Sequence, residues 1–386
     1  MTATTSAYTR ELEVSAAARE LAAQIERSLP KPDALICFFS ARHDHAALLA
    51  ELSRRYPAAV LVGCSSAGEF SSEYQGEGSA SIFAISSDDM VFTSSLATGI
   101  SNRPAEAARE LLSRFRGFSD GRFVHRSALI LNDALAGSAD ELVRMLNVQT
   151  GGKYKFFGGG AGDDAAFSRT YVFDGTRVET NAAVALEILS RKPLGVGVRH
   201  GWAPATQPLR VTSSTGAVVG SLNAIAAADV FSHHAEATGQ QLDRQAPLSF
   251  FLHNIAGMRL PEGYKLRVPL GIGAAGEVSF AAEVPEGVAV SIMTATAESS
   301  TEAAREATED AVTQLAGAKP AGALMFDCVA TRLRLGQAFG QEVQAVREAV
   351  GEVPMAGCNT YGQVASAEGQ FTGFHNCTAV ICVFPE

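Results

Sequence analysis

The chain lacks the sequence marks of a membrane-spanning or secreted protein. No apolar run approaches 18 residues, so no membrane-spanning helix is predicted. Residues 1–14 are rich in Thr and Ser and have no basic start followed by an apolar stretch, which excludes a secretory signal. Neither CxxC nor CxxCH occurs, and the absence of CxxCH excludes covalent haem attachment. We therefore expect a cytoplasmic protein.

Basic residues are also scarce. The chain of 386 residues has 31 Lys and Arg against 41 Asp and Glu, a net charge of −10, and no basic cluster. A protein this acidic is not expected to bind nucleic acid through a basic face. Apolar material is abundant: 47% of the residues are hydrophobic and only 19% are charged, as in a globular protein with a large core. The length predicts two or more lobes.

Cysteine is sparse, and its placement predicts packing more than chemistry. Most of the six cysteines stand inside apolar segments that are typical of strands; they are Cys37, Cys64, Cys328, Cys358, Cys377 and Cys382. In the expected reducing compartment, such residues pack as small hydrophobic side chains. We therefore predict buried, reduced thiols.

Two short stretches of the chain are near copies of one another. They are Gly63-Cys64-Ser65-Ser66-Ala67-Gly68 and Gly357-Cys358-Asn359-Thr360-Tyr361-Gly362, each preceded by an apolar segment. A third copy, without cysteine, is Gly158-Gly159-Gly160-Ala161-Gly162. Glycine permits positive φ and close backbone approach. We predict that these stretches are turns that line a pocket.

The segments that begin at Ala34, Ala128 and Ala323 share one order of elements. Each has a buried strand, a helix, a glycine-rich turn and a further strand. Such internal repetition predicts related structural units. We expect a mixed α/β (α+β) fold of two related lobes of sheet and helices, joined near Lys192–Trp202.

Three local predictions accompany this fold. Residues 1–29 are expected to form an N-terminal helical segment, because Ala, Leu and Ile recur at helical spacing over residues 11–28. Ser79–Ser86 and Met90–Leu96 are expected to pair as a hairpin. Pro247–His253, which is strongly apolar, is expected to be a strand.

Taken together, these motifs resemble the FIST sensory domains over nearly the whole chain, from about residue 30 to the end. The resemblance rests on Val62–Glu69, Phe157–Asp164, Gly201–Pro204 with Val211-Thr212, Gly357–Gln363 and His375–Thr378. It implies a FIST N-terminal domain over residues 30–193 and a FIST C-terminal domain over residues 194–386. Gln363 stands where the family usually has a glutamate.

The resemblance also implies a function. FIST domains are intracellular small-ligand sensors that act on signalling partners. A chain without an attached kinase or cyclase looks most similar to the subgroup described as nitric-oxide-sensing haem proteins. By that likeness, the partner is a histidine kinase of a two-component system with an effect on cyclic-di-GMP signalling. A homodimer is also possible, and the small ligand or haem is the expected bound group.

Candidate site residues fall into two sets. The predicted ligand-binding residues come from the glycine stretches: Gly63, Cys64, Ser65, Ser66, Gly158, Gly159, Gly357, Cys358, Asn359 and Tyr361. A haem would need an axial ligand beside an apolar cleft. His375 is the preferred axial candidate, and His234 and His253 are the next. A structural role for His375, hydrogen-bonded to the nearby turn, stays open.

Two other functions stay open beside haem-based sensing. One is a module that binds a small metabolite such as an amino acid, because helix N-termini and turn amides suit a carboxylate. The other is a hydrolase with Cys64 as nucleophile. The GxSxG pattern is not met, and the sequence places no His and acid beside Cys64. We therefore expect a protein that is not an enzyme.

Overall fold

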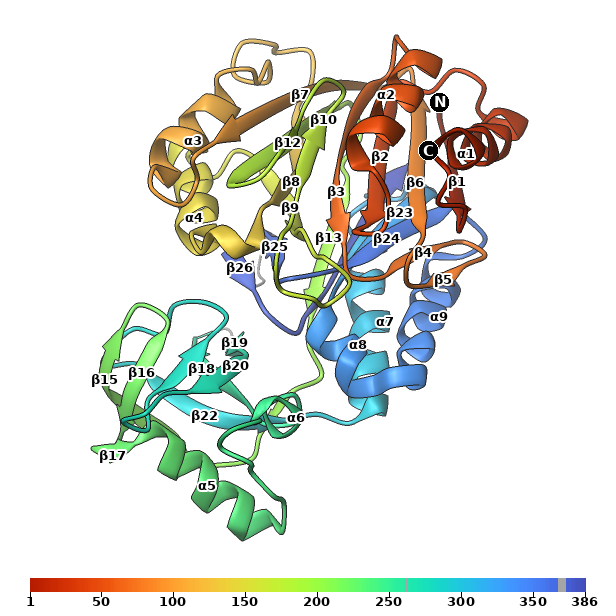
Figure 1. Cartoon of the computed structure of the whole chain (residues 1–386). Helices are drawn as coiled ribbons and strands as arrows, with labels where there is room; N and C mark the ends of the chain where they lie inside the picture. The colour runs from red at the N-terminus through yellow and green to blue at the C-terminus, as the bar shows by residue number, and fades with distance from the viewer. Residues whose placement is uncertain (262, 367–372) are drawn as a thin grey trace.

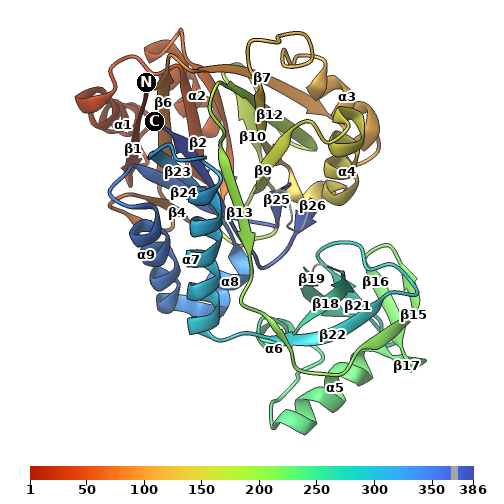
Figure 2. The same cartoon turned by 180° about the vertical axis from the view of Figure 1, so that it is seen from behind.

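The computed structural model describes residues 1–261, 263–366 and 373–386. It shows a mixed α/β fold with a large lobe and a small lobe, which confirms the predicted fold class (Figures 1 and 2). Three six-stranded sheets belong to the large lobe, and a nine-stranded sheet belongs to the small lobe. Within the described residues, no helix is both long and apolar enough to cross a membrane.

The large lobe is built from three copies of one unit, each with four strands and two long helices. The first is β1 (Thr2–Thr9), α1 (Val14–Ser28), β2 (Ala34–Ser40), α2 (His45–Arg55), β3 (Val60–Ser66) and β6 (Ala80–Ser87). The second is β7 (Met90–Thr98), α3 (Pro104–Leu112), β8 (His125–Asn132), α4 (Ala139–Thr150), β9 (Lys155–Gly160) and β12 (Ala182–Ser190). The third is β13 (Gly195–Arg199), α7 (Ala297–Thr313), β23 (Pro320–Cys328), α9 (Phe339–Val350), β24 (Met355–Thr360) and β27 (Ala379–Pro385), with the short α8 (Val329–Leu335) before α9.

The three units have the same strand order in their sheets. The orders are β1-β6-β2-β3, β7-β12-β8-β9 and β13-β27-β23-β24, with a parallel pair at the end of each. The predicted repetition of strand, helix, glycine stretch and strand is therefore a real repeat, present three times.

Each unit also gives a hairpin to the sheet of another unit. The hairpin β4–β5 (Glu69–Ser71, Gln75–Gly76) pairs with β24, β10–β11 (Val172–Asp174, Val178–Glu179) with β3, and β25–β26 (Gln363–Ala365, Gly373–His375) with β9. First unit pairs with third, second with first and third with second. This cyclic exchange ties the three units into one body.

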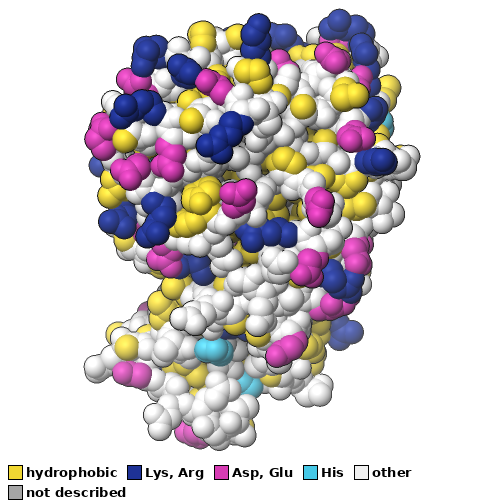
Figure 3. Space-filling model, turned by 90° about the vertical axis from the view of Figure 1, so that its right-hand side faces the viewer, with side chains coloured by type: hydrophobic (Ala, Val, Ile, Leu, Met, Phe, Trp, Pro, Cys, Tyr) yellow, Lys and Arg dark blue, Asp and Glu magenta, His cyan; other side chains and the backbone are white. Residues whose placement is uncertain are grey.

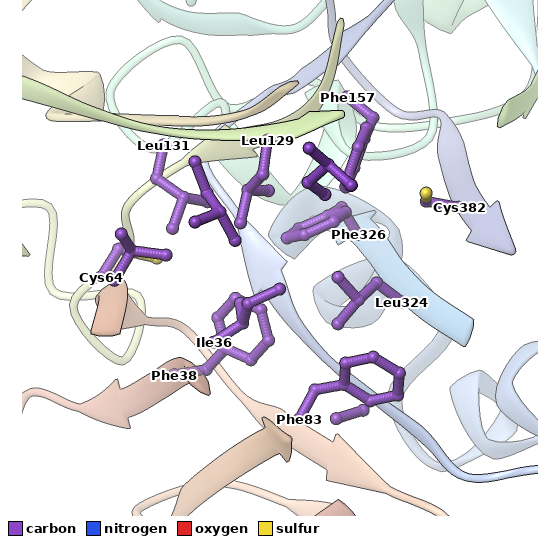
Figure 4. Packing of buried hydrophobic residues seen from close by; sticks show 14 of the residues in the cluster. Ile36, Phe38, Cys64, Phe83, Leu129, Leu131, Phe157, Leu324, Phe326 and Cys382 are labelled. Carbon is purple, nitrogen blue, oxygen red and sulfur yellow. The ribbon is translucent and has the colours of Figure 1, made fainter. Parts of the chain in front are cut away.

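A shared core lies between the three sheets. Figure 4 shows Phe38, Leu129 and Phe326, one from each unit, pointing into the same space. The Phe38 and Phe326 rings meet edge to face with centroids 5.6 Å apart, a favoured aromatic geometry. The inward strands are buried on both faces, which explains their continuous apolar runs. The helices lie outside these sheets (Figure 1).

The small lobe is inserted into the third unit. It lies between β13 and α7, where the first and second units have only the short links 10–13 and 99–103. Its elements are β14 (Ala203–Pro204), β15 (Leu209–Thr215), β16 (Val218–Leu222), β17 (Ile225–Ala226), α5 (Ala227–Thr238), α6 (Leu248–Phe251), β18 (Ile255–Leu260), β19 (Gly263–Arg267), β20 (Pro269–Ile272), β21 (Val278–Phe280) and β22 (Ala289–Thr294). It has its own core around Phe231 and Phe251. On the face in Figure 3, charges of both signs are interspersed over the large lobe, and the small lobe carries few.

Three local predictions need correction. Residues 1–29 contain α1 but also β1, which pairs along its length with β6. The strands β6 and β7 do not pair, because β7 begins the next unit and lies in another sheet. Pro247–His253 is not a strand: Pro247 precedes α6, and its fixed φ favours a helix start. The predicted domain boundary at residues 193/194 falls between β12 and β13.

Candidate functional site

The three glycine stretches meet where β3, β9 and β24 end. Backbone hydrogen bonds link them in a cycle: Ala67 N to Asn359 O at 3.0 Å, Gly162 N to Ser65 O at 2.9 Å, and Gly160 N to Gly362 O at 2.8 Å. The sequence copies are therefore neighbours in space. Each stretch belongs to one of the three units and lies on the side of the large lobe that faces the small lobe (Figure 1).

The first glycines of these stretches are not in turns. Gly63, Gly158 and Gly357 lie inside β3, β9 and β24, which corrects the prediction of turns at these positions. A Cβ on Gly357 would lie 1.9 Å from Met325 O, and the Phe70 ring covers the same spot at 2.4 Å. Glycine is needed there for close packing between strands. Gly158 also has a positive φ, at +135°, and the turn glycine Gly362 follows with a φ of +97°.

The cysteines and serines of the stretches are also buried. Cys64, Ser65, Ser66 and Cys358 are all 0% exposed. Burial and the neighbouring Cys64 thiol raise the pKa of Cys358 well above its ordinary value. These side chains pack the junction of the first and third units. Of the predicted ligand-binding residues, Tyr361 reaches a cavity.

That cavity lies between the lobes and has a volume of about 220 Å³. The large lobe contributes the last residue of β23 and residues that follow β8, β9, β23, β24 and β26, and the small lobe contributes residues around α6, β20 and β21. Its lining is Ala134, Leu135, Phe167, Leu248, Leu252, Val268, Leu270, Phe280, Ala281, Cys328, Val329, Ala330, Leu333, Tyr361, Gly362 and Asn376. None of these side chains is charged.

The rim of this interlobe cavity is unusually apolar for a protein surface. Five large hydrophobic side chains of the lining are more than a third exposed: Leu135, Phe167, Leu248, Leu270 and Leu333. Single exposed hydrophobic residues are ordinary, but a gathering of them around one opening marks a binding site. This gathering identifies the interlobe cavity as the candidate site.

The cavity also has a side-chain oxygen that accepts no hydrogen bond from the described residues. Asn376 is 2% exposed, its Nδ2 donates to the His375 carbonyl at 3.2 Å, and its Oδ1 accepts no hydrogen bond within the described residues. A buried acceptor left unpaired costs free energy. Oδ1 is thus available to a ligand that carries a hydrogen-bond donor.

The loop after β9 places an aromatic pair at the cavity mouth. Phe167 has a left-handed backbone with φ of 52°, and its ring stacks on Tyr361 with centroids 4.5 Å apart. The Asp163 carboxylate fixes the loop: it accepts the backbone N–H groups of Phe167, Ser168 and Arg169 at 2.7–2.8 Å, and the Tyr361 hydroxyl donates to it.

A buried ion pair joins the lobes beside this site. Asp140 of α4 pairs with Lys265 and Arg267 of β19, and the Lys265 Nζ to Asp140 Oδ1 distance is 2.8 Å. The Arg267 side chain is 1% exposed and also donates to the carbonyl oxygens of Glu283 and Leu266. Because both cations come from the small lobe, their loss of contact would accompany separation of the lobes.

None of the three candidate haem ligands lines the interlobe cavity. His375 is 1% exposed in β26, His253 is exposed on the small lobe, and His234 shares a 3.0 Å hydrogen bond with Asn254. The cavity is smaller than the roughly 300–1,000 Å³ typical of ligand pockets, and no histidine lines it. It does not fit a haem. Among the described residues, no group of three metal-ligating side chains gathers elsewhere.

Sequence reasoning missed Cys328, Asn376 and Phe167. The repeat itself held one signal: Cys328 ends the first parallel strand of its unit, where Ser40 and Asn132 end theirs. An alignment of the three units would have singled out a cysteine at a position that is otherwise small and polar. The small-lobe side of the cavity has no counterpart in the repeat and gave no such signal.

Comparisons with known proteins give family matches over most of the chain. The family model for the FIST N domain matches residues 33–225, and the model for the FIST C domain matches residues 227–366. A search of curated proteins gives no match.

Solved structures give only distant likenesses. Cyanuric acid hydrolase from A. caulinodans is 10% identical with a TM-score of 0.35, and 99% of both chains is covered. A second cyanuric acid hydrolase is 13% identical with a TM-score of 0.34 and full coverage of both chains. T. maritima PurL complexed with FGAR is 13% identical with a TM-score of 0.24, over 99% of this chain and 72% of that one. TM-scores this low do not indicate the chemistry of this chain.

Proposed function

Because the chain belongs to the FIST family, we propose that it is a sensor which binds a compact, neutral, largely apolar ligand between its two lobes. The family membership indicates small-ligand sensing and signalling. The interlobe cavity, with its five exposed apolar rim residues and the unpaired Asn376 Oδ1, supports this class of ligand.

The cavity limits the size and charge of the ligand. A cavity of about 150 Å³ holds benzene, so about 220 Å³ has room for roughly nine non-hydrogen atoms. A charged group would lose its hydration, and the lining has no Asp, Glu, Lys, Arg or His side chain to pair with it. A donor on the ligand would satisfy Asn376. The amino acid that the sequence left open as an alternative suits this lining less well than a neutral ligand.

Binding between lobes supplies a route to a signal. A ligand that contacts both lobes favours the arrangement in which they are close, and it shifts the population toward that arrangement. We propose that a partner signalling protein, with a histidine kinase of a cyclic-di-GMP pathway as the candidate, reads this shift. Autophosphorylation of such a kinase, measured with this protein and with or without ligand, tests the partner.

The ligand class is tested with indole, which is neutral, has about nine non-hydrogen atoms and carries one N–H donor. Indole should raise the thermal unfolding midpoint in a concentration-dependent way. Indene, which lacks the N–H, should raise it less, and zwitterionic L-leucine should leave it unchanged. A shift with leucine but none with indole would overturn the proposal.

A blocking variant ties the shift to the cavity. Ala281 is exposed at the mouth, so Ala281→Trp should remove the indole shift without disturbing the core. Ala274→Trp, also exposed on the small lobe but outside the lining, is the matched control. Equal indole shifts in both variants would place the binding elsewhere.

Haem is tested separately by the absorption spectrum of protein prepared with haem. Since the cavity is too small and lacks histidine, we expect no stoichiometric Soret band. A stoichiometric band that shifts with nitric oxide and is lost in His375→Ala would restore haem-based sensing as the function. His234→Ala and His253→Ala serve as matched variants.

A further inference from the structure

Cys328 is the one cysteine of the chain's six that lines the interlobe cavity. It ends β23, and its register partner is Thr360. The matching positions in the other units hold Ser40 and Asn132, whose partners are Ser66 and Gly160. A thiol therefore stands at this position in the unit that carries the small lobe.

The surroundings of Cys328 favour its thiolate. The Cys377 thiol donates a hydrogen bond to the Cys328 sulfur, and the Ala330 backbone N–H and the Gln363 side chain donate further bonds. These contacts lower the pKa of Cys328 to about 6 against the opposing effect of burial. The pKa of Cys377 is raised well above its ordinary value by the same contact, so Cys377 keeps its proton. Cys377 has a left-handed backbone, with a φ of 52°, in the loop that holds its side chain beside Cys328.

Three charged or titratable groups surround this thiol pair: Asp327 on the same strand as Cys328, Arg334 on α8 and Glu342 on α9. Burial and Glu342 raise the pKa of Asp327 well above its usual range, and burial raises the pKa of Glu342 to about 7. Carboxyls that retain their protons oppose a nearby thiolate less than ionised ones. The Arg334 guanidinium acts on Cys377 and favours negative charge in the pair.

The cavity determines what can reach this sulfur. Apart from Cys328, the lining has no Asp, Glu, Lys, Arg or His side chain, and its rim is apolar, so the cavity favours neutral molecules. The Asn376 Oδ1, which accepts no hydrogen bond from the described residues, lies in the residue next to Cys377. A neutral electrophile with an N–H donor would satisfy both features. Nucleophilic attack requires a thiolate with access to its target. The groups around Cys328 favour its thiolate, and the cavity gives the sulfur access to a ligand.

We propose that Cys328 is a covalent attachment site for compact neutral electrophiles of the α,β-unsaturated carbonyl class, with Cys377 as a positioning residue that stabilises the thiolate. This proposal rests on the proposed function, because it uses the same ligand cavity. A ligand attached covalently would stay in the cavity and prolong the signal.

The reaction balances without an oxidant. The Cys328 thiolate attacks the β-carbon, a sulfur–carbon bond forms, and the π pair of the carbon–carbon double bond moves to the α-carbon as an enolate. The enolate takes a proton from water, and hydroxide is released. The product is a neutral thioether in the cavity.

Acrylamide is the probe, because it is neutral, small enough for the cavity and carries N–H donors. The native protein is treated at pH 6.5, and adducts are located by intact mass and peptide mapping. We expect one adduct, at Cys328, formed at least tenfold faster than at any other cysteine. Acrylate, an anion of the same size, should react far less once each rate is divided by that of the same reagent with glutathione.

Matched variants separate attachment from positioning. Cys328→Ser should abolish the adduct, and Cys382→Ser, a buried cysteine outside the cavity, should leave it unchanged. Cys377→Ser should keep the site of attachment but shift the pH profile of the rate upward by more than one pH unit. Thermal unfolding confirms that each variant is folded.

The outcomes distinguish the two proposals. An adduct spread over several cysteines, no adduct in the native protein, or a Cys328–Cys377 disulfide formed instead would overturn the covalent proposal. If indole still raises the unfolding midpoint in those cases, the cavity remains a ligand site and only the covalent chemistry fails. If neither indole nor acrylamide binds, both proposals fail.

Discussion

Glu69 is a buried carboxyl whose protonation makes folding stability depend on pH. It begins β4 and is 0% exposed. The Ser66 hydroxyl donates to Oε1, and the Ser79 N–H and hydroxyl donate to Oε2 at 2.9 and 2.7 Å. Burial nonetheless raises its pKa from 4.5 to about 7, because desolvation outweighs these hydrogen bonds.

The sign and size of the effect follow from this difference. Between pH 4.5 and about 7, the folded chain still holds the proton that the unfolded chain has released. The stabilisation is complete below pH 4.5 and is lost as the pH rises to about 7. A difference of that size corresponds to about 3 kcal/mol of unfolding free energy. Glu69→Gln, which stays neutral, should remove this loss.

The third unit contains the arrangement that the variant would adopt. Gln363 begins β25 as Glu69 begins β4, each after a turn glycine. Its Oε1 accepts the Thr378 N–H and hydroxyl at 3.3 and 3.2 Å, and its Nε2 donates to Thr360 at 2.9 Å. A glutamine at position 69 can match these bonds with Ser79 and Ser66. We therefore expect Glu69→Gln to fold without loss of stability at pH 5.

Urea unfolding at pH 5 and pH 8 measures the effect as the difference between the variant and the native chain. Glu69→Gln should gain about 3 kcal/mol relative to the native chain on going from pH 5 to pH 8. The exposed Glu286→Gln is the matched control and should show no such gain. Gln363→Glu should introduce the same pH dependence into the third unit. An unchanged pH dependence in Glu69→Gln would refute the assignment.

Asp140→Asn removes the carboxylate beside the buried Arg267 guanidinium and should lower the free energy of unfolding in urea by about 3 kcal/mol. Adding Arg267→Met to this variant should recover most of the loss. A loss under about 1 kcal/mol in Asp140→Asn alone would contradict the role of the pair. Gly357→Ala would place a Cβ 1.9 Å from Met325 O and should cost at least about 3 kcal/mol, read by thermal unfolding. Gly121→Ala, where nothing lies within 4 Å and φ is not positive, is its control, and equal melting of the two would show that the strands can separate.

Much of the large lobe could be predicted from local pattern. The continuous apolar runs at Ala34 and Ala128 predicted strands buried on both faces, and the structure has β2 and β8 there. All six cysteines are buried and free, as expected. These features depend on neighbours in sequence or on burial alone, so the sequence carries them directly.

The candidate site could be predicted only in part. Tyr361 lines the cavity, but Gly63 and Gly357 serve the packing of strands. The error has a physical cause: glycine permits a turn and also permits close packing against a neighbouring strand, and the sequence does not distinguish the two. Asn376 stands in the His375–Thr378 motif, but the sequence did not indicate its unpaired oxygen, which is defined by what surrounds it in space.

The sequence by itself determined the composition of the core, the threefold recurrence of strand, helix and glycine stretch, and the family. Each follows from residue type and spacing along the chain. Only the tertiary structure decided that the hairpins exchange between units, that the third unit carries an inserted lobe, and that the two lobes enclose an uncharged cavity beside Cys328. Those features join residues more than 200 positions apart, such as Ala134 and Asn376, and such contacts exist only after the chain has folded.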